Sequence, residues 1–544
     1  MTAAQSEVVI DAHAASHSAA MKRLAALLLL ALAGCVEAQP PAPSCSDTRS
    51  HCVDQVSLGD RFGCALLHDR TVWCWGRNDE SQLGYPTTDL CQEDVGGGMT
   101  RAVACHAYPF QVVGLDHAVA VVTGAAFACA LRDDGSVRCW GSNGAGQLGN
   151  GLTLPSPTPV PVHGLSGVTA LAAGARHACA LSGDTVSCWG ANDRGQLGQA
   201  STTRQCTVGG ETFGCEPLPV QVPAIDGVAG LTAGAKHTCA RTADGLVACW
   251  GDNRYAQLGT GRASDAPSPT PSATLAGELP LNGITSVTAG ANHTCALALD
   301  GRVWCWGRDD HGETGSAADH VVPPHCVQSC VPRPAEVPGL EHRDAAIPTD
   351  ASGDDALVVG PSDDATTGFD GGSLDAALDA GTVDASTRRD AGRDVATRDG
   401  GVVDGAADDA AMGDASDDAS LADAGREVES VSAPSMVPRG VSAGGTFACT
   451  VLDDGTARCW GDDSEDQLGD GRRTADPQPP VMVIASPGSA STNPLQGVAS
   501  VASGAATSCA LLGDGSLRCW GSNQSGALGN GSSGPQSGPV PVTW

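Results

Sequence analysis

The chain has 544 residues, of which only 3% are aromatic, and its 62 acidic against 30 basic residues give a net charge of −32. Such a charge repels a phosphate backbone, so we expect no nucleic acid among the partners of the protein. The 23 cysteines recur at regular spacing, which points to an oxidising compartment because a reducing cytosol would leave so many thiols without a role.

The N-terminal segment indicates export. Residues 1–20 are polar and alanine-rich and fit neither a signal nor a fold, so we expect a dispensable extension, with translation starting at Met21. Residues 21–35 begin with basic side chains and continue with an apolar run from Leu24 to Ala33. That run is too short to span a bilayer and is typical of a signal-peptide core.

The apolar run ends in Leu32-Ala33-Gly34-Cys35, which resembles the bacterial lipobox. The resemblance implies that Cys35 is acylated on sulfur and becomes the N-terminus after cleavage, with residues 36–51 as a tether. Setting Cys35 aside from the 23 cysteines leaves 22, the even number that complete pairing requires. We expect an exported lipoprotein of the cell envelope, in the outer membrane or at the cell surface, whose lipid is its only membrane contact. An ordinary secretory signal, with Cys35 incidental, is the alternative.

A short signature then recurs seven times, in five copies within residues 52–340 and two within residues 437–544. Each copy has a cysteine, a tight turn, a second cysteine, Trp-Gly and a Gly-rich tail. Short strand-like segments with almost no helical periodicity are typical of a β-propeller blade. The sequence therefore predicts an all-β fold built from seven similar units.

The two cysteines of each copy are expected to face each other across a hairpin. In the second copy, Asp133-Asp134-Gly135 is a three-residue turn with Gly at its left-handed position, which places Cys129 opposite Cys139. In the third copy the turn shortens to Gly183-Asp184 and the cysteines stand one residue closer, so they face each other again. Opposed residues have Cα atoms about 4.5 Å apart, within disulfide range, whereas free thiols or a metal are the alternatives. The predicted disulfides are Cys64–Cys74, Cys129–Cys139, Cys179–Cys188, Cys239–Cys249, Cys295–Cys305, Cys449–Cys459 and Cys509–Cys519.

Other positions of the signature favour packing over chemistry. Just before the first cysteine, His177, His237 and His293 alternate with Phe in other copies, so packing is the main interpretation and metal binding or catalysis the alternative. The recurrent Trp is interpreted as core. The Gly-rich tails do not follow a strand to open a helix, as a phosphate-binding loop would. The fifth tail departs from the pattern, and the sixth has Asp463 in place of Asn.

Shorter insertions follow the first, third and fifth Gly-rich tails, and each contains two cysteines. We expect local pairing, although other connectivities stay open. Near Cys326 and Cys330, the histidines His311, His320 and His325 make zinc an alternative. If the insertions share one face, they form the most individual surface of the molecule and the expected binding site. The locally predicted pairs are Cys45–Cys52, Cys91–Cys105, Cys206–Cys215 and Cys326–Cys330.

Between the fifth and sixth copies lies a long acidic segment, residues 341–436. Its residues 341–430 contain 20 Asp, 3 Glu and 6 Arg, a net charge of −17, with one aromatic side chain and no cysteine. Because such a composition cannot bury a core, we predict a disordered insertion. Calcium binding is the alternative, but the Asp-x-Asp-x-Asp-Gly spacing is missing.

Read together, the string Gly-x-x-His-x-Cys-Ala-Leu, then Asp-Gly-x-Val-x-Cys-Trp-Gly and Gly-Gln-Leu-Gly, resembles the repeat of the regulator-of-chromosome-condensation (RCC1) family. The resemblance covers about residues 52–340 and 437–544 and implies a seven-bladed propeller closed into one ring. If blades are cut at the Trp-Gly strand, Val53 to Leu66 would complete the blade begun by the C-terminal copy. The nuclear member of the family acts on a small GTPase and on chromatin, and we expect neither partner for an exported acidic protein.

We therefore expect a binding scaffold that holds an unknown protein or cell-surface polymer through loops on one face. The alternative is an envelope enzyme acting on glycan or peptidoglycan. No Ser/His/Asp grouping or paired-carboxylate motif stands out, so we expect no catalytic residue, no cofactor and no metal. Carboxylates or histidines that converge in a central pocket would favour the enzyme, whereas bland walls with varied rim loops would favour binding.

Overall fold

The computed structural model describes residues 51–95, 99–223, 225–315, 326–340, 437–485, 493–534 and 536–544. All regular elements of these residues are β-strands. The chain divides into two units, one made of residues 1–346 and 432–544 and the other of residues 347–431. Every strand belongs to the first unit, whereas the predicted disordered insertion lies outside the described residues.

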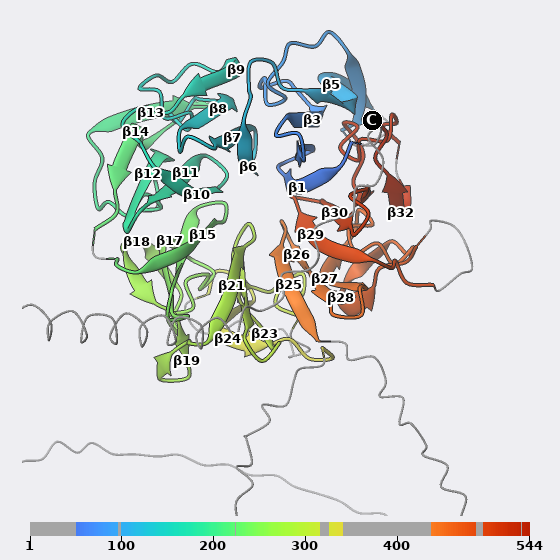
Figure 1. The fold of residues 1–544 in the computed structure, drawn as a ribbon. Coiled ribbons are helices and arrows are strands. Elements are labelled where there is room, and N and C mark those ends of the chain that lie inside the picture. Colours follow the sequence, from blue (N-terminus) through green and yellow to red (C-terminus); the bar gives the residue numbers. More distant parts are fainter. Residues whose placement is uncertain are drawn as a thin grey trace, which may run out of the picture. The chain divides into compact units, whose positions relative to one another are not determined.

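The strands of the first unit form seven antiparallel sheets, arranged around a central axis as the blades of a propeller (Figure 1). This confirms the predicted seven-bladed, all-β fold. From the axis outward, blades 1 to 3 contain β1 (Val53–Leu58), β2 (Phe62–Leu67), β3 (Val72–Arg77), β5 (Thr100–Gln111) and β4 (Leu90–Asp94); β6 (Ala118–Thr123), β7 (Phe127–Arg132), β8 (Val137–Gly141) and β9 (Ser156–Pro161); and β10 (Val168–Ala173), β11 (His177–Ser182), β12 (Thr185–Ala191), β14 (Glu211–Gln221) and β13 (Arg204–Val208).

The other four blades have four strands each, and a separate two-stranded hairpin follows the fourth. Blades 4 to 7 contain β15 (Val228–Ala233), β16 (His237–Thr242), β17 (Val247–Asn253) and β18 (Ser264–Ala273); β21 (Ile284–Ala289), β22 (His293–Ala298), β23 (Val303–Arg308) and β24 (Cys330–Glu336); β25 (Pro438–Ala443), β26 (Phe447–Leu452), β27 (Ala457–Asp463) and β28 (Thr474–Met482); and β29 (Val498–Ser503), β30 (Thr507–Leu512), β31 (Leu517–Gly521) and β32 (Gln536–Pro541). The extra hairpin is β19 (Leu275–Ala276) with β20 (Leu279–Pro280).

The second strand of each blade carries the first repeat cysteine, and the third strand carries the second cysteine with Trp-Gly. The hairpin between them has the register that the turn length predicts, so Cys129 pairs with Cys139 and, across the shorter turn, Cys179 pairs with Cys188. In all seven blades a disulfide joins the two cysteines, with Cα atoms 4.0–4.1 Å apart. These disulfides are buried between blades, where they hold the hairpins in register.

Neighbouring blades pack through the repeat tryptophan and the Gly-rich tail. The Trp189 indole Nε1 donates to the carbonyl of Gln147 in the preceding blade at 2.8 Å. Gly149 ends that tail at φ 65°, and a Cβ added there would lie 2.9 Å from Trp189 Nε1. Glycine is therefore required both for the backbone conformation and for the close approach of the ring.

The ring closes between blades 7 and 1 by the same contacts, without exchange of strands. Trp75 Nε1 donates to the carbonyl of Ala527 at 2.8 Å, and the His51 ring stacks on Trp544 at 5.0 Å. The expectation that Val53 to Leu66 completes the C-terminal blade was wrong, because β1 and β2 pair with β3 and blade 7 has its own inner strand. Each repeat supplies the strand that precedes its own cysteines, so the blade boundary falls before that strand.

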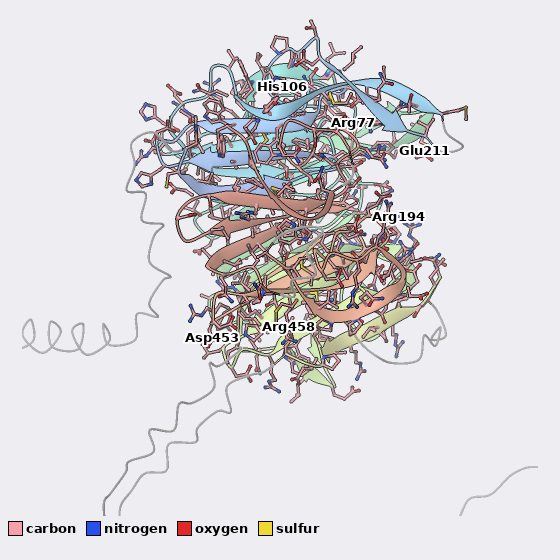
Figure 2. The ribbon with its side chains drawn as sticks, turned by 90° about the vertical axis from the view of Figure 1, so that its right-hand side faces the viewer. Arg77, His106, Arg194, Glu211, Asp453 and Arg458 are labelled. Carbon is pink, nitrogen blue, oxygen red and sulfur yellow. A yellow bond between two sulfur atoms is a disulfide. The ribbon has the colours of Figure 1, made fainter. Side chains whose placement is uncertain are left out.

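The chain path gives the ring two faces. The turns from inner to second strands and the segments that follow the third strands form the insertion face. The hairpins between second and third strands and the connections between blades form the hairpin face. Figure 2 views the ring edge-on, with Arg194 and Glu211 toward one side and Asp453 toward the other. By chain path, His51, Leu340 and Val437 lie at the hairpin face.

Candidate binding face

All three cysteine-containing insertions lie on the insertion face, because each follows a third strand. The first forms the hairpin β4–β5 with the disulfide Cys91–Cys105, and the third forms the hairpin β13–β14 with Cys206–Cys215. The fifth carries Cys326–Cys330 at the start of β24. Cys52 is disulfide-bonded, whereas Cys45 and the predicted lipidation site Cys35 lie outside the described residues.

The disulfide between Cys326 and Cys330 removes the thiolates on which the zinc alternative depended. His320 and His325 lie outside the described residues. His311 instead lies beside two carboxylates of its own tail.

A buried glutamate connects the first insertion to the last blade. Glu93 is 1% exposed, and its Oε2 lies 3.2 Å from Arg61 Nη1 and 3.2 Å from Arg101 Nη2. Its Oε1 accepts the hydroxyl of Ser525 in blade 7 and lies 3.6 Å from Arg77 Nη1. Burial alone would raise the pKa of Glu93, but the Ser525 hydroxyl and the arginines outweigh it and hold that pKa below its usual range. The cluster fastens β4–β5 across the ring closure.

A second charged cluster lies on the tail of blade 5. Arg308 Nη2 donates to Asp310 Oδ2 at 2.6 Å, and His311 Nδ1 lies 3.3 Å from Asp310 Oδ1 and 3.6 Å from Glu313 Oε1. The Glu313 carboxylate raises the pKa of His311 to about 9, and burial raises the pKa of Glu313. His311 and Arg308 therefore supply the positive charge that these carboxylates need, and the group requires no metal.

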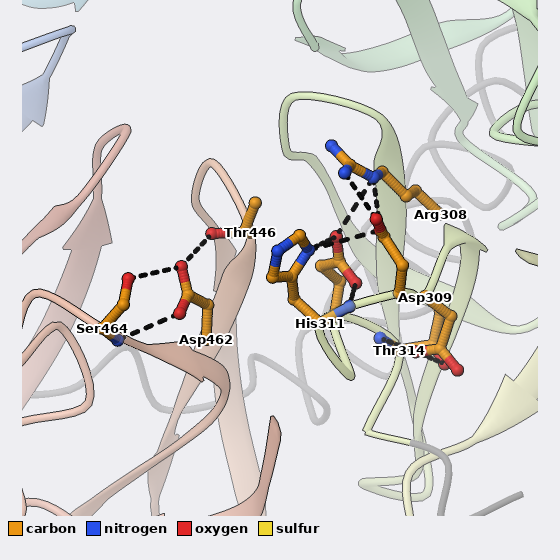
Figure 3. Close-up of polar contacts among 9 residues, drawn as sticks. Arg308, Asp309, His311, Thr314, Thr446, Asp462 and Ser464 are labelled. Carbon is orange, nitrogen blue, oxygen red and sulfur yellow. Dashed lines mark hydrogen bonds and ion pairs between the residues drawn. The ribbon is translucent and has the colours of Figure 1, made fainter. Parts of the chain in front are cut away.

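Figure 3 draws this cluster with its neighbours on blade 6. There, Asp462 Oδ2 accepts the hydroxyls of Thr446 at 3.0 Å and Ser464 at 3.1 Å. An ion pair also joins blades 3 and 4, because Lys236 Nζ lies 2.6 Å from Asp193 Oδ2. The insertion face thus presents fixed charges of both signs.

The described residues that line the central channel are mostly small and uncharged. A cavity of about 250 Å³ at its insertion-face end is lined by seven Gly-containing turns, and one of about 370 Å³ lies between the inner strands. Among the described residues that line these two cavities, Asp60 is the only titratable one. Several hydroxyls lie there, but each bonds to a neighbouring strand; Ser442 Oγ, for example, accepts the backbone N–H of Ser503 at 3.0 Å. The hydroxyls stabilise the ring and are not paired with a base.

The repeat histidines lie at blade interfaces, fully buried. The Thr238 hydroxyl donates to the carbonyl of Gln196, so His177 Nε2, 2.9 Å from Thr238 Oγ1, must carry a proton and donate to it. His237 makes the same contact with Thr294 at 2.9 Å. The Nδ1 atoms of His177 and His237 have no hydrogen-bond partner, and burial lowers their pKa to about 4 and about 3, respectively.

Several large exposed apolar side chains lie on the insertions and tails, while Leu279 (72%) and Leu299 (69%) are equally exposed on the hairpin face. Leu90 (65% exposed) and Met99 (64%) lie on the first insertion, Leu154 (72%) on the tail of blade 2 and Val327 (58%) on the fifth insertion. Large exposed apolar groups beside fixed charges are typical of protein interaction surfaces.

Sequence reasoning identified the insertions but missed the charged clusters. One signal was present in the repeat: Glu313 stands where most tails have Gln. No comparable signal marks Glu93, whose partners come from the turn before β2, from β3 and β5, and from blade 7.

Comparison with known proteins places this ring in a family. A family model described as the RCC1-like domain matches residues 29–367, and one described as the regulator of chromosome condensation (RCC1) repeat matches residues 498–527. The chain belongs to the RCC1-like domain family. This RCC1-like chain is 30% identical over 277 residues to the ultraviolet-B receptor UVR8 of Arabidopsis thaliana, covering 49% of the chain and 56% of the receptor. It is 28% identical over 303 residues to protein pim1 of Schizosaccharomyces pombe, covering 53% and 54%.

The RCC1-like chain thus spans about half the length of these two relatives. Solved structures agree in fold. Human WBSCR16 matches with a TM-score of 0.57 at 19% identity, covering 87% of this chain and 94% of that one. Prp20p of Saccharomyces cerevisiae matches with a TM-score of 0.53 at 18% identity, covering 83% and 80%.

Proposed function

We propose that this RCC1-like propeller is a binding scaffold, anchored outside the cell by lipid on Cys35, that holds a partner through its insertion face. The observation that carries the proposal is the placement of all three stapled insertions on that face. The described chain enters the ring at His51, on the hairpin face. A tether that ends at His51 therefore joins the ring on the face opposite to the insertions.

The compartment fits this role. Ten disulfides join cysteines of the described residues, and such a number indicates an oxidising environment. No helix among the described residues has the length and apolarity needed to cross a membrane.

A protein is favoured as the partner over a polymer. The structure of Prp20p is described together with its binding to Gsp1p and histones, and another structure of yeast RCC1 shows it bound to Kap60. The exposed leucines and methionine of the insertions suit a protein surface better than a glycan. Binding is favoured over catalysis because Asp60 is the only titratable residue among the described residues that line the two channel cavities.

Loop exchange tests the proposal. Residues 200–215, which contain β13 and the first part of β14, would be replaced by the short tail of blade 2, residues 151–155, which links the same two positions of a blade without an insertion. The matched control shortens the β19–β20 hairpin on the hairpin face. We expect the exchange to lower capture of the native partner from envelope extracts at least about tenfold. The control should leave capture unchanged.

Protease treatment of the extract before capture separates a protein partner from a polymer. Unchanged capture by variants lacking each of the three insertions would overturn the binding-face proposal. Equal loss in the β19–β20 control would do the same, because it would place the partner on the hairpin face.

A further inference from the structure

The first Asn of a Gly-rich tail normally holds that tail in place through hydrogen bonds of both its amide oxygen and its amide nitrogen. In blade 2, Asn143 Oδ1 accepts the N–H of Leu148 at 3.0 Å, while its Nδ2 donates to the carbonyls of Leu152 at 3.1 Å and Leu154 at 2.9 Å. Blade 7 repeats the arrangement around Asn523. The amide hydrogens therefore satisfy carbonyl oxygens that are gathered at one point.

In blade 6, Asp463 takes the place of this Asn. Its Oδ1 accepts the N–H of Leu468 at 3.1 Å, as the Asn oxygen does, so its Oδ2 stands where the amide nitrogen would be. Asp463 is fully buried and its Oδ2 has no hydrogen-bond partner. In blade 4, whose third and fourth strands pair as those of blade 6 do, Asn253 Nδ2 donates to the carbonyl of Arg262 at 2.7 Å, and the counterpart of Arg262 in blade 6 is Arg472. A carboxylate oxygen thus stands where an amide donor meets this carbonyl in blade 4.

A second Asn has changed in the same tail. Asn143 Nδ2 lies 3.4 Å from Asn150 Oδ1, and blade 7 has the same contact between Asn523 and Asn530. Blade 6 has Asp470 at this position, and its Oδ1 accepts the N–H of Arg472 at 2.9 Å, just as Asn150 Oδ1 accepts that of Leu152 at 3.1 Å. Two facing amides have become two facing carboxylates.

A third carboxylate belongs to the same turn. Asp466 adopts φ 61°, where four other tails have glycine, and its Oδ1 is buried without a hydrogen-bond partner. Residues 462–473 contain five carboxylates and two arginines, and Arg473 Nη2 is paired with Glu465 at 3.1 Å. Burial raises the pKa of Asp463 to about 7, with the neighbouring aspartates adding to the shift. The tail is short of positive charge.

We propose that the tail of blade 6 binds a calcium ion. Asp463, Asp470 and the carbonyl oxygen of Arg472 supply the protein ligands. An irregular all-oxygen set of carboxylates and backbone carbonyls, completed by water, is what Ca²⁺ accepts and the octahedral Mg²⁺ does not. The ion replaces the hydrogens that the Asn amide supplies in other blades, and it joins Asp463 to the segment that leads into β28.

The full chain, acidic segment included, provides the test. Thermal unfolding is measured in EDTA and with increasing Ca²⁺, and Tb³⁺ luminescence excited through tryptophan reports direct occupancy. Trp520 suits this readout because its indole lies against Gly469, next to Asp470. We expect a saturable rise in Tm of at least about 2 °C with Ca²⁺.

The double variant D463N/D470N restores the amide pair of blades 2 and 7. It should fold with at least the Tm of the wild type in EDTA and lose both the Ca²⁺-dependent rise and the Tb³⁺ signal. D476N/D265N, which removes two charges from exposed positions, should keep both. The reverse variant N143D/N150D should add a second Tb³⁺ site in blade 2.

Two results would overturn the proposal. If Ca²⁺ leaves the Tm of the wild type unchanged, a proton on Asp463 Oδ2 supplies the missing hydrogen instead. If D463N/D470N keeps the full rise in Tm, the ion binds elsewhere on the chain.

Discussion

Single residues decide how one blade meets the next. Each repeat histidine contacts the next blade one residue after that blade's own histidine position. His177 thus contacts Thr238, which follows His237, and His237 contacts Thr294, which follows His293. His293 departs from this pattern, because the residue that it meets in the next blade is Ala448, which has no hydroxyl. The next blade therefore provides a hydroxyl for two of the three histidines.

Ala448→Thr should complete the third contact. A hydroxyl there can accept from His293 Nε2 and donate to the carbonyl of Glu313, which already accepts Trp460 Nε1 at 3.1 Å. We expect the free energy of unfolding to rise by about 1 kcal/mol, measured by urea denaturation. The control Ala178→Thr places the same hydroxyl opposite Phe127, so it can donate to the carbonyl of Gln147, as Ser508 donates to that of Gln467, but has no histidine to accept from and should gain less stability. A loss of stability in both variants would contradict the expected contact.

Buried neutral histidines also predict acid sensitivity. Because burial lowers the pKa of His177 to about 4, the unfolded chain binds a proton below pH 6.5 that the folded chain does not. The free energy of unfolding is therefore unaffected by His177 above pH 6.5. As the pH falls from 6.5 toward 4, this free energy decreases by up to roughly 3 kcal/mol. His177→Phe, which copies the first, second and sixth blades, should flatten the pH dependence of the urea midpoint between pH 7 and 4.5. An unchanged slope would contradict this account.

The packing role of these histidines could be predicted from the sequence, because His alternates with Phe in the repeat. The residues to which the histidines bond could not be predicted. His177 and Thr238 are 61 residues apart, and only the register between two blades brings them together. The same applies to Glu93, which meets Ser525 at a separation of 432 residues.

At the scale of elements, the Gly-rich tail of each blade forms the surface on which the repeat tryptophan of the next blade packs. Its backbone carbonyl receives the indole N–H, and its last glycine allows the ring to approach. The sequence predicted the hairpins and their register from turn length, because a turn of two or three residues fixes which residues face each other. It did not predict the blade boundary, because a strand pattern does not show with which neighbour the strand pairs.

Gly149→Ala measures how much this packing between the tail and the tryptophan contributes to stability. The new Cβ would lie 2.8 Å from Val162 Cγ1 and 2.9 Å from Trp189 Nε1, so we expect a loss of about 2 to 4 kcal/mol in the free energy of unfolding. Gly164→Ala is the matched control, since Gly164 also has a positive φ, 79°, but has no atom within 4 Å of a built Cβ. The difference between the two denaturation curves isolates the packing cost. Equal effects would show that backbone strain alone matters.

At the scale of the whole molecule, ring closure depends on contacts between the first and last blades. Glu93→Gln removes the buried charge that three arginines surround and should cost about 2 to 3 kcal/mol. Glu465→Gln, which breaks the more exposed pair with Arg473, should cost less than about 1 kcal/mol. Chemical denaturation of the two variants under identical conditions tests the comparison, and similar losses would argue against a closing role for Glu93.

The stacking of His51 on Trp544 has a consequence for connectivity. Since the described ends of the ring meet at 5.0 Å between ring centroids, a short peptide can join them, and the chain can be opened between Leu340 and Val437 instead. Such a circular permutant keeps every blade intact, because each sheet is formed from consecutive strands. We expect it to retain the disulfides and to unfold at a midpoint close to that of the parent. The order in which the blades are synthesised is then a property of the gene and not a requirement of the ring.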